Sequence, residues 1–482
     1  MNCAMNGKQR SGFTIAIVGG GFTGAMLAVQ LFRTADKSVS VVLIERGGVP
    51  GLGVAYGTQF EGHLLNVRAN DMSAYPDIPD HFFNWAQVHY NSSVKADDFL
   101  PRSVYGQYIA SQFQEARQLH PSRLRCIQGE AVSLTPTGGL TSVLLADGQI
   151  VLADKVVISI GHFPPGEPSL PGKTAASSRY LANPWATNTV REVSQGNSVL
   201  LIGSGLTSLD MVIELRARGF GGTIHILSRR GLLPQSHKIT APFAPFRTED
   251  LPLTVRGLVR LIRRQIKAAE SEGSDWRAVM DSLRPLTQEI WRTLPRPEQR
   301  RFLRHLRTYW EVHRHRIAGQ IANRLALQLQ SGQIQMHAGR IMEYREDSAG
   351  VEISYRARKH GETVRLHVDR VVNCTGPESN YRRVNSPLLQ DLMNKGLARP
   401  DELSLGLDVS GDGALVDAQG KPSDFLYTLG PLRKGNLWET IAVPEIRVQA
   451  AEMARLLTGH KPEDAKDASS AAETELSTSL DR

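Results

Sequence analysis

The chain has few cysteines and no long uncharged apolar run. Its three cysteines, Cys3, Cys126 and Cys374, are far apart among 482 residues and form no C-x-x-C pair. Scattered thiols in odd number are typical of a reducing compartment, and their spacing excludes a sequence-local redox disulfide. No uncharged apolar segment approaches the ~20 residues that span a bilayer, and the polar start MNCAMNGKQRSG has no signal-peptide core. These features predict a cytoplasmic protein without a membrane span.

The charge of the chain is unevenly distributed. The formal net charge is +8, and residues 251–330 alone contain sixteen Lys/Arg and seven Asp/Glu. Such a segment could attract nucleic acid, an anionic membrane or an acidic substrate. An arginine-rich solvated helical surface is the favoured interpretation, and the sequence indicates no clear nucleic-acid site. A length of 482 residues and a hydrophobic content of 41% predict an ordinary globular protein of several domains.

A dinucleotide-binding fingerprint lies near the N-terminus. The β-branched run at residues 14–18 leads into Gly19, Gly21 and Gly24, which occupy the glycine positions of G-x-G-x-x-G, and a helical segment follows. These glycines permit a tight turn, approach of a pyrophosphate to the backbone, and close packing of helix on strand. The next expected strand ends on Glu45, followed by Arg46, about 20 residues on. An acid at this position binds a ribose hydroxyl, and it favours FAD here.

A second fingerprint begins at Ser198. SVLLIGSGLTSLDMVIELRARG repeats the strand, glycine loop and helix, with Gly203, Gly205 and Ser208 at the three small positions. The following strand ends not on an acid but on Ser228, Arg229 and Arg230. A carboxylate would repel a 2′-phosphate whereas serine and arginine bind one, so NADPH is favoured over NADH. Two dinucleotides side by side imply hydride transfer from nicotinamide to flavin.

The remaining segments complete an α/β fold of two Rossmann-like dinucleotide-binding domains, for FAD and NADPH, with a helical insertion. Residues 63–85 are too irregular for one helix, and a helix is expected to begin at Arg102 or soon after. Residues 123–161 read as strands, with a hairpin turn at 147–148. His313 and His315 point in different directions on a helix, so no metal site is expected. We expect four segments: the first part of the FAD domain at 12–170, the NAD(P) domain at 190–345 with helical segment 251–330, the returning part of the FAD domain at 346–458, and a disordered tail at 459–482.

The motif order GGGFTG, ISIG, GSGLTS and NCTG resembles the two-dinucleotide-binding-domain flavoproteins, and within them the flavin-containing and N-hydroxylating monooxygenases. The segment NVRANDMSAYPD, residues 66–77, is similar to the stretch that lies near the flavin ring in that branch. GVAYGT, FLPRSVYGQY, SRRGLLP and GPLRKGNLWETIAVPEIRVQA also resemble a bacterial family of largely uncharacterised FAD/NAD(P)-binding proteins, over most of residues 13–457.

The resemblance implies two sets of cofactor contacts. FAD would be bound by Gly19, Gly21, Gly24, Glu45 and Asn66, and further candidate cofactor-binding residues are Arg46, Met72, Ser73, Gly376 and Gly430. NADPH would be bound by Gly203, Gly205, Ser208, Arg229 and Arg230, and Asn66 is the candidate catalytic group. The chain departs from the pattern in two places: it lacks the histidine of the Baeyer–Villiger signature, and Gly430-Pro431 stands where many relatives have Gly-Asp.

Three functions follow from these patterns. The leading hypothesis is an NADPH-dependent flavin monooxygenase that uses molecular oxygen on a small molecule, with hydroxylation of an amine nitrogen as one form. The second is a flavin reductase that passes electrons to a diffusible acceptor or a partner protein. The third is a flavin-binding protein that acts on nucleic acid through residues 251–330.

Overall fold

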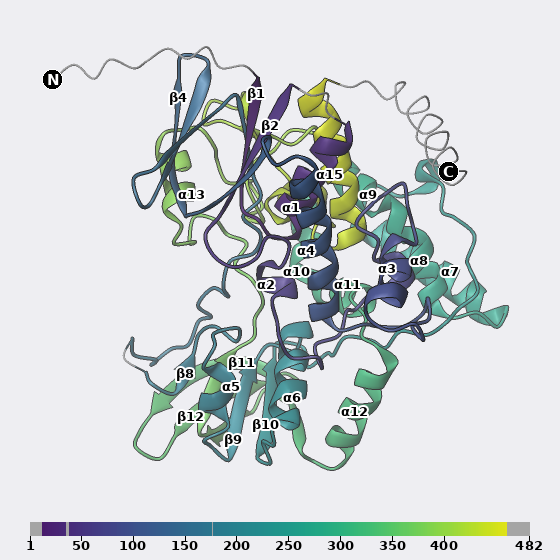
Figure 1. The fold of residues 1–482 in the computed structure, drawn as a ribbon. Helices are drawn as coiled ribbons and strands as arrows, with labels where there is room; N and C mark the ends of the chain where they lie inside the picture. The colour runs from purple at the N-terminus through teal and green to yellow at the C-terminus, as the bar shows by residue number, and fades with distance from the viewer. Residues whose placement is uncertain (1–11, 35–37, 176, 460–482) are drawn as a thin grey trace.

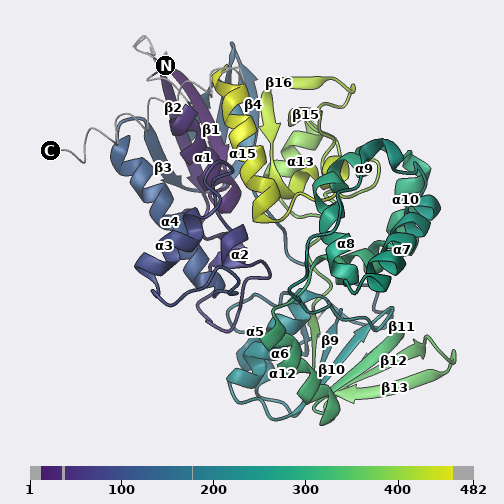
Figure 2. The same ribbon diagram turned by 90° about the vertical axis from the view of Figure 1, so that its right-hand side faces the viewer.

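The structure is a computed structural model that describes residues 12–34, 38–175 and 177–459. Figure 1 shows two sheet-containing domains, one above the other, and Figure 2 shows a group of helices on one side of the junction between them. Cys3 and the tail expected beyond Gly459 lie outside the described residues. In the described part of the chain, no helix has the length and apolar character needed to cross a membrane.

The first domain is built on a six-stranded sheet of order β15-β16-β7-β1-β2-β3. β1 pairs in parallel with β2 and β7, and its residues from Thr14 to Val18 are buried. An all-apolar strand with glycine directly after it suits a central position, because both faces of a parallel sheet are covered. The strands of this sheet are β1 (Phe13–Val18), β2 (Val39–Glu45), β3 (Leu124–Gln128), β7 (Lys155–Ile158), β15 (Ala414–Val416) and β16 (Pro422–Thr428).

Different elements cover the two faces of this sheet. Helices α1 (Phe22–Thr34), α4 (Arg102–Leu119) and α15 (Val443–Thr458) pack on one face, so the last described helix lies against the first. The other face carries α13 (Pro387–Asn394) and a three-stranded antiparallel sheet, whose β5–β6 turn at residues 147–148 confirms the expected hairpin. The antiparallel strands are β4 (Ala131–Thr137), β5 (Leu140–Leu145) and β6 (Ile150–Ala153).

The second domain is built on a seven-stranded sheet of order β13-β12-β11-β10-β9-β14-β8. β11 pairs in parallel with β10 as far as Ala338 and then antiparallel with β12, so one long strand joins the two halves of the sheet. Helices α5 (Thr189–Val193), α6 (Leu206–Ala217) and α12 (Gly319–Gln330) cover one face. The strands are β8 (Tyr180–Leu181), β9 (Ser198–Ile202), β10 (Thr223–Ser228), β11 (Ile334–Glu346), β12 (Val351–Ala357), β13 (Thr363–Val368) and β14 (Arg370–Asn373).

One expected boundary is corrected by this topology. The sequence-based division places everything after residue 345 in the FAD domain, but β12, β13 and β14 belong to the second sheet. The apolar strand before Gly376 pairs in parallel with β9, a long-range contact that no local pattern reports. The helical segment 251–330 consists of two parts in the structure. Its last helix, α12, packs on the second sheet, and the helices before it form a separate group.

The remaining helices form an insertion between β10 and β11, seen beside the domain junction in Figure 2. It consists of α7 (Val255–Ser271), α8 (Trp276–Leu283), α9 (Thr287–Thr293), α10 (Arg296–His305) and α11 (Arg307–Arg314), with short turns at Thr248–Asp250 and Arg284–Leu286. Many of its basic residues are engaged: Arg284 and Arg314 bond Glu445 of α15, and Arg277 bonds Asp275. The net positive charge of the segment is thus partly taken up by ion pairs with neighbouring elements.

Short elements connect these parts of the fold. α2 (Gly53–Tyr56), a turn at Ala69–Asp71 and α3 (His81–His89) lie in the irregular stretch before α4, which begins at Arg102 as expected. A turn at Gly430–Arg433 and α14 (Lys434–Leu437) lead from β16 toward α15.

The first glycine loop yields a prediction about stability. A Cβ added to Gly24 would overlap the carbonyl oxygen of Gly19, whereas one added to Gly21 would have the Gly53 Cα as its nearest neighbour, at 3.7 Å. Gly24→Ala is therefore expected to lower the free energy of unfolding by about 1–3 kcal/mol through overpacking. Gly21→Ala, the control from the same loop, should change it by less than about 0.5 kcal/mol. Urea denaturation of both variants measures this, and equal stabilities would contradict the tight packing of α1 on β1.

Candidate functional site

The first glycine loop forms a tight cradle between β1 and α1. Gly19 has a φ of +103°, and a Cβ there would lie 2.5 Å from the carbonyl oxygen of Ser159. Glu45, at the end of β2, accepts hydrogen bonds from the N–H of Gly20 at 2.6 Å and of Gly47 at 3.0 Å. Space beside Gly21 leaves the backbone open to a ligand. This arrangement fits a dinucleotide, with the pyrophosphate at the start of α1 and a ribose near Glu45.

The second glycine loop has the same geometry with one substitution. Gly203 has a φ of +111°, and a Cβ on Gly205 would meet no atom within 4 Å. Ser208, at the third small position, is fully buried, and its hydroxyl donates to the carbonyl oxygen of Gly203 at 2.6 Å. The serine thus closes the contact between helix and loop with a hydrogen bond in place of glycine packing. The open start of α6 is a fitting phosphate site.

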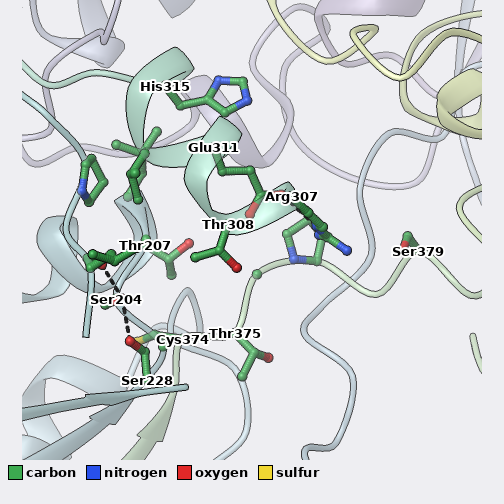
Figure 3. A pocket seen from close by; sticks show the side chains of 18 of the residues that line it. Ser204, Thr207, Ser228, Arg307, Thr308, Glu311, His315, Cys374, Thr375 and Ser379 are labelled. Atoms are coloured by element: carbon green, nitrogen blue, oxygen red, sulfur yellow. Dashed lines mark hydrogen bonds and ion pairs between the residues drawn. The ribbon is translucent and has the colours of Figure 1, made fainter. Parts of the chain in front are cut away.

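The end of β10 shows which predicted groups are available to a ligand. Ser228 accepts a hydrogen bond from the Ser204 hydroxyl at 2.9 Å, drawn in Figure 3. Arg230 is engaged by α11, because it donates to the Tyr309 hydroxyl at 3.0 Å and its guanidinium lies 4.7 Å from the Tyr309 ring centroid. Arg229 is exposed and forms no ion pair within the described residues. Of the two arginines, Arg229 is the one free to bind an anion.

Three further arginines border the same space. Arg340 of β11, and Arg356 and Arg358 at the end of β12, are exposed and line the same cavity as Arg229. Their cationic groups form no ion pair with any described carboxylate. Sequence reasoning missed these residues, because β12 was expected in the other domain and only the pairing of β11 with β12 brings them near β10.

A cavity of about 1270 Å³ joins the two domains. From the second domain it is lined by Gly203, Gly205 and the loop after β14, including Gly376. From the first domain it is lined by Tyr56, Asn66 and Met72. Figure 3 shows α11 above the strand ends that carry Ser228, Cys374 and Thr375, with Arg307, Thr308 and Glu311 extending from it into the space between.

The predicted site residues fall into two groups. Seven of them line the cavity: Asn66, Met72, Gly203, Gly205, Arg229, Arg230 and Gly376. Others take part in the loops around it: Gly19, Gly21, Gly24, Glu45, Arg46, Ser73, Ser208 and Gly430. Ser73 is fully buried and donates to the carbonyl oxygen of Ile78 at 2.6 Å, so its hydroxyl supports the chain turn and does not face the cavity. Gly430 is held by Gln449 and Thr440, and its neighbour Pro431 is the residue that reaches the cavity wall.

Contacts between the domains fix the width of the cavity. Arg102, the first residue of α4, forms a two-pronged ion pair with Asp210 of α6, at 2.9 and 3.1 Å. The ring Nε2 of His237 lies 3.0 Å from the backbone oxygen of Asn66, and burial lowers the pKa of His237 to about 4. A neutral His237 therefore bonds Asn66 at physiological pH. A cation in the first turn of a helix opposes the helix dipole, so the position of Arg102 in the sequence indicates a carboxylate partner elsewhere in the chain.

Titratable side chains cluster on the wall opposite the second glycine loop. Burial, with the nearby Arg307, lowers the pKa of Lys434 to about 8, and burial, with Lys434, lowers the pKa of His162 to about 4. Burial alone would raise the pKa of Glu439, but His315, Arg314 and a hydrogen bond from Trp310 together lower it. At pH 7 this wall therefore carries an ionised Glu439, a largely charged Lys434 and a neutral His162.

Comparison with known proteins supports this geometry. Residues 16–163 match a family model described as FAD-NAD(P)-binding. Uncharacterised proteins of Mycobacterium tuberculosis and Mycobacterium bovis are 25% identical over 399 residues, which cover 74% of this chain and 73% of theirs.

Solved structures share the fold over nearly the whole chain. The desferrioxamine-pathway cadaverine monooxygenase of Erwinia amylovora has a TM-score of 0.65 and 14% identity, covering 93% of this chain and 95% of its own. The ornithine N-hydroxylase of Kutzneria sp. 744 has a TM-score of 0.63 and 13% identity, covering 92% and 99%. The thioredoxin reductase of Lactococcus lactis has a TM-score of 0.52 and 12% identity, covering 93% and 98%. Residues 16–163 thus match an FAD/NAD(P)-binding family, and the described chain shares the two-sheet α/β fold of these solved structures.

Proposed function

We propose that the protein is an FAD-dependent oxidoreductase that takes electrons from NADPH. The observation that carries this proposal is the single cavity shared by the second glycine loop and by Tyr56, Asn66 and Met72 of the first domain. Two dinucleotides held by the two loops would meet in that space. Electron transfer between cofactors needs such a direct meeting, because the described cysteines, Cys126 and Cys374, form no disulfide relay.

The chain's own residues would bind and orient the two cofactors. The N–H groups at the starts of α1 and α6 would hold the pyrophosphates, and Glu45 would exchange its bond to Gly20 for one to a ribose hydroxyl. Arg229, with Arg340, Arg356 and Arg358, would bind a 2′-phosphate. When bound, NADPH supplies a hydride and FAD passes its electrons to oxygen or to another acceptor.

Within this class we propose a monooxygenase that acts on a small molecule, with N-hydroxylation as one form. The solved ornithine N-hydroxylase and cadaverine monooxygenase support it, because they match 92% and 93% of the chain at TM-scores of 0.63 and 0.65, against 0.52 for the thioredoxin reductase. Asn66 would place a polar group beside the reacting atoms, and the buried walls at Met72 and Trp438 would exclude water. In the overall reaction, one oxygen atom of O2 enters the substrate, the other leaves as water, and NADPH provides both electrons.

The arginine cluster predicts the choice of nicotinamide cofactor. Arg229→Ala is expected to raise KM for NADPH about tenfold, the effect of losing one charge-assisted hydrogen bond worth ~1.5 kcal/mol, and to leave KM for NADH nearly unchanged. Initial rates with both cofactors measure this. Arg365→Ala is the matched control, because Arg365 is an exposed arginine of β13 that does not line the cavity. Equal effects of Arg229→Ala on NADPH and NADH would count against a 2′-phosphate site.

Labelled oxygen distinguishes a monooxygenase from a reductase. With 18O2, NADPH and a panel of amines, thiols and apolar alcohols, a monooxygenase gives a product that contains one 18O atom. Mass spectrometry of the products detects it, and hydrogen peroxide measured in parallel accounts for the remaining electrons. If NADPH is consumed and every panel member returns unlabelled with stoichiometric peroxide, the reductase alternative is favoured.

Asn66 provides a residue-level test of the same reaction. Asn66→Ala is expected to lower kcat for labelled product about tenfold or more, because a polar group positioned for the reacting atoms is lost. Asn70→Ala is the control, since Asn70 is exposed on the same segment and does not line the cavity. Bound FAD, measured by absorbance, shows whether either variant has lost the cofactor instead. An unchanged kcat in Asn66→Ala would remove Asn66 from the reacting site.

A further inference from the structure

A second cavity, of about 590 Å³, lies inside the helical insertion. Its volume is in the range of small-molecule binding sites, ~300–1,000 Å³. Apolar side chains from α7 to α11 and from Trp438 form nearly all of its wall: Val255, Leu258, Val259, Ile262, Ile266, Trp276, Met280, Leu283, Ile290, Trp291, Leu294, Phe302, Leu306, Tyr309, Trp310 and Trp438. We call this space the apolar chamber.

The polar atoms of three aromatic side chains in the chamber wall bond to groups outside it. The indole N–H of Trp310 donates to Glu439 at 2.7 Å, and that of Trp291 donates to the Gly435 carbonyl at 2.9 Å. The Tyr309 hydroxyl accepts from Arg230. With these partners in place, most of the wall presents hydrocarbon and ring surfaces, and the charged residues that also line it, Arg263 and Glu270 of α7, are exposed. Half-buried residues of α7, such as Val259 and Ile262, face this space and lack the close packing of a core helix.

Trp438 separates the apolar chamber from the cofactor cavity and lines both. Its ring lies 5.1 Å from those of Trp291 and Phe302, and its backbone has a φ of +61°. Ser404 is the one other non-glycine residue with positive φ in the described ranges. Such a conformation is costly for a bulky residue and is found where the surroundings enforce it, often at functional sites. Its buried indole nitrogen has no hydrogen-bond partner among the described residues.

Cations border this wall on the side of the cofactor cavity. The ammonium of Lys434 lies 4.9 Å from the ring centroid of Trp438, and the guanidinium of Arg307 lies 5.9 Å from it. Arg307 is paired with Glu311, but Lys434 forms no ion pair with any described carboxylate. A cationic group that approached Trp438 would meet Lys434 and Arg307, whose charges Glu311 and Glu439 offset in part, whereas a neutral polar group would meet no repulsion.

We propose that the apolar chamber binds the hydrocarbon body of the substrate and that Trp438 is where its polar end turns toward the cofactor cavity. The substrate class is a small aliphatic or aromatic compound with a neutral polar end. This inference rests on the proposed function and narrows its substrate. It separates this chain from the solved neighbours named for ornithine and cadaverine, which carry amino groups.

Binding can be measured without NADPH, so the result is independent of the oxidoreductase activity. Four of the six tryptophans line the chamber, and intrinsic fluorescence therefore reports its occupancy. In the FAD-loaded protein, 10-bromodecan-1-ol should quench tryptophan fluorescence by contact, and decan-1-ol should displace it. Competition by hexan-1-ol, octan-1-ol and decan-1-ol should strengthen about fourfold per added methylene. Decylamine should compete more weakly than decan-1-ol.

Variants locate the binding site. Ile262→Trp fills the chamber and should weaken decan-1-ol binding at least tenfold, and Val259→Asp, which places a charge in it, should do the same. Arg260→Ala, the matched control on the exposed face of α7, should bind as the parent does. The melting temperature and the FAD content of each variant show whether it is folded. If Val259→Asp unfolds, Ile262→Trp still tests the chamber.

Three results would contradict a part of this proposal or of the proposed function. Binding that ignores chain length, or that survives both Ile262→Trp and Val259→Asp, overturns the chamber as the site. Decylamine that competes as well as decan-1-ol overturns the exclusion of cationic ends. If alcohols bind as predicted but NADPH is never oxidised, the chamber stands and the proposed function fails.

Discussion

The ion pair between Arg102 and Asp210 joins the two domains beside the cavity. Arg102 starts a helix of the first domain, Asp210 lies on the helix after the second glycine loop, and both side chains are largely removed from water. Loss of one partner of such a pair costs about 3–5 kcal/mol, because the other charge is left buried. Arg102 also donates to the backbone oxygen of Leu64, close to Asn66, so the pair positions the chain that lines the cavity. The cavity between the proposed cofactor sites depends on this contact.

The two glycine loops solve one packing problem in different ways. In the first, the backbone of Gly24 lies so close to Gly19 that no side chain fits. In the second, Ser208 fits because its hydroxyl donates to the carbonyl oxygen of Gly203. Both solutions leave the helix start open toward a ligand, since nothing lies within 4 Å of a Cβ on Gly205. The fingerprint is therefore a backbone geometry that the sequence can satisfy by more than one residue.

The features that the sequence predicted well are local ones. The structure confirms three predictions that depend only on neighbouring residues. These are the two units of strand, glycine loop and helix, the hairpin turn at residues 147–148, and the start of α4 at Arg102. The boundary at residue 346 was wrong because the partner of β14 is β9, about 170 residues earlier in the chain. Arg340, Arg356 and Arg358 were missed for another reason: the pairing of β11 with β10 and of β12 with β11 brings these arginines near the end of β10. Arg230 looked equivalent to Arg229 in sequence, and only its contact with Tyr309 distinguishes them.

The helical insertion is the part of the fold with most freedom to set the substrate. The glycine loops would hold the cofactors mainly through backbone atoms, so the side chains of these loops have little influence on which substrate binds. The insertion instead contributes side chains: α11 supplies Glu311 to the cofactor cavity and Tyr309 and Trp310 to the apolar chamber, and His315, directly after α11, also lines the cofactor cavity. Glu439 ties Trp310 to the chain before α15, which places the insertion against the first domain. A change in the insertion can thus alter what reaches Trp438 while the cofactor loops remain unchanged.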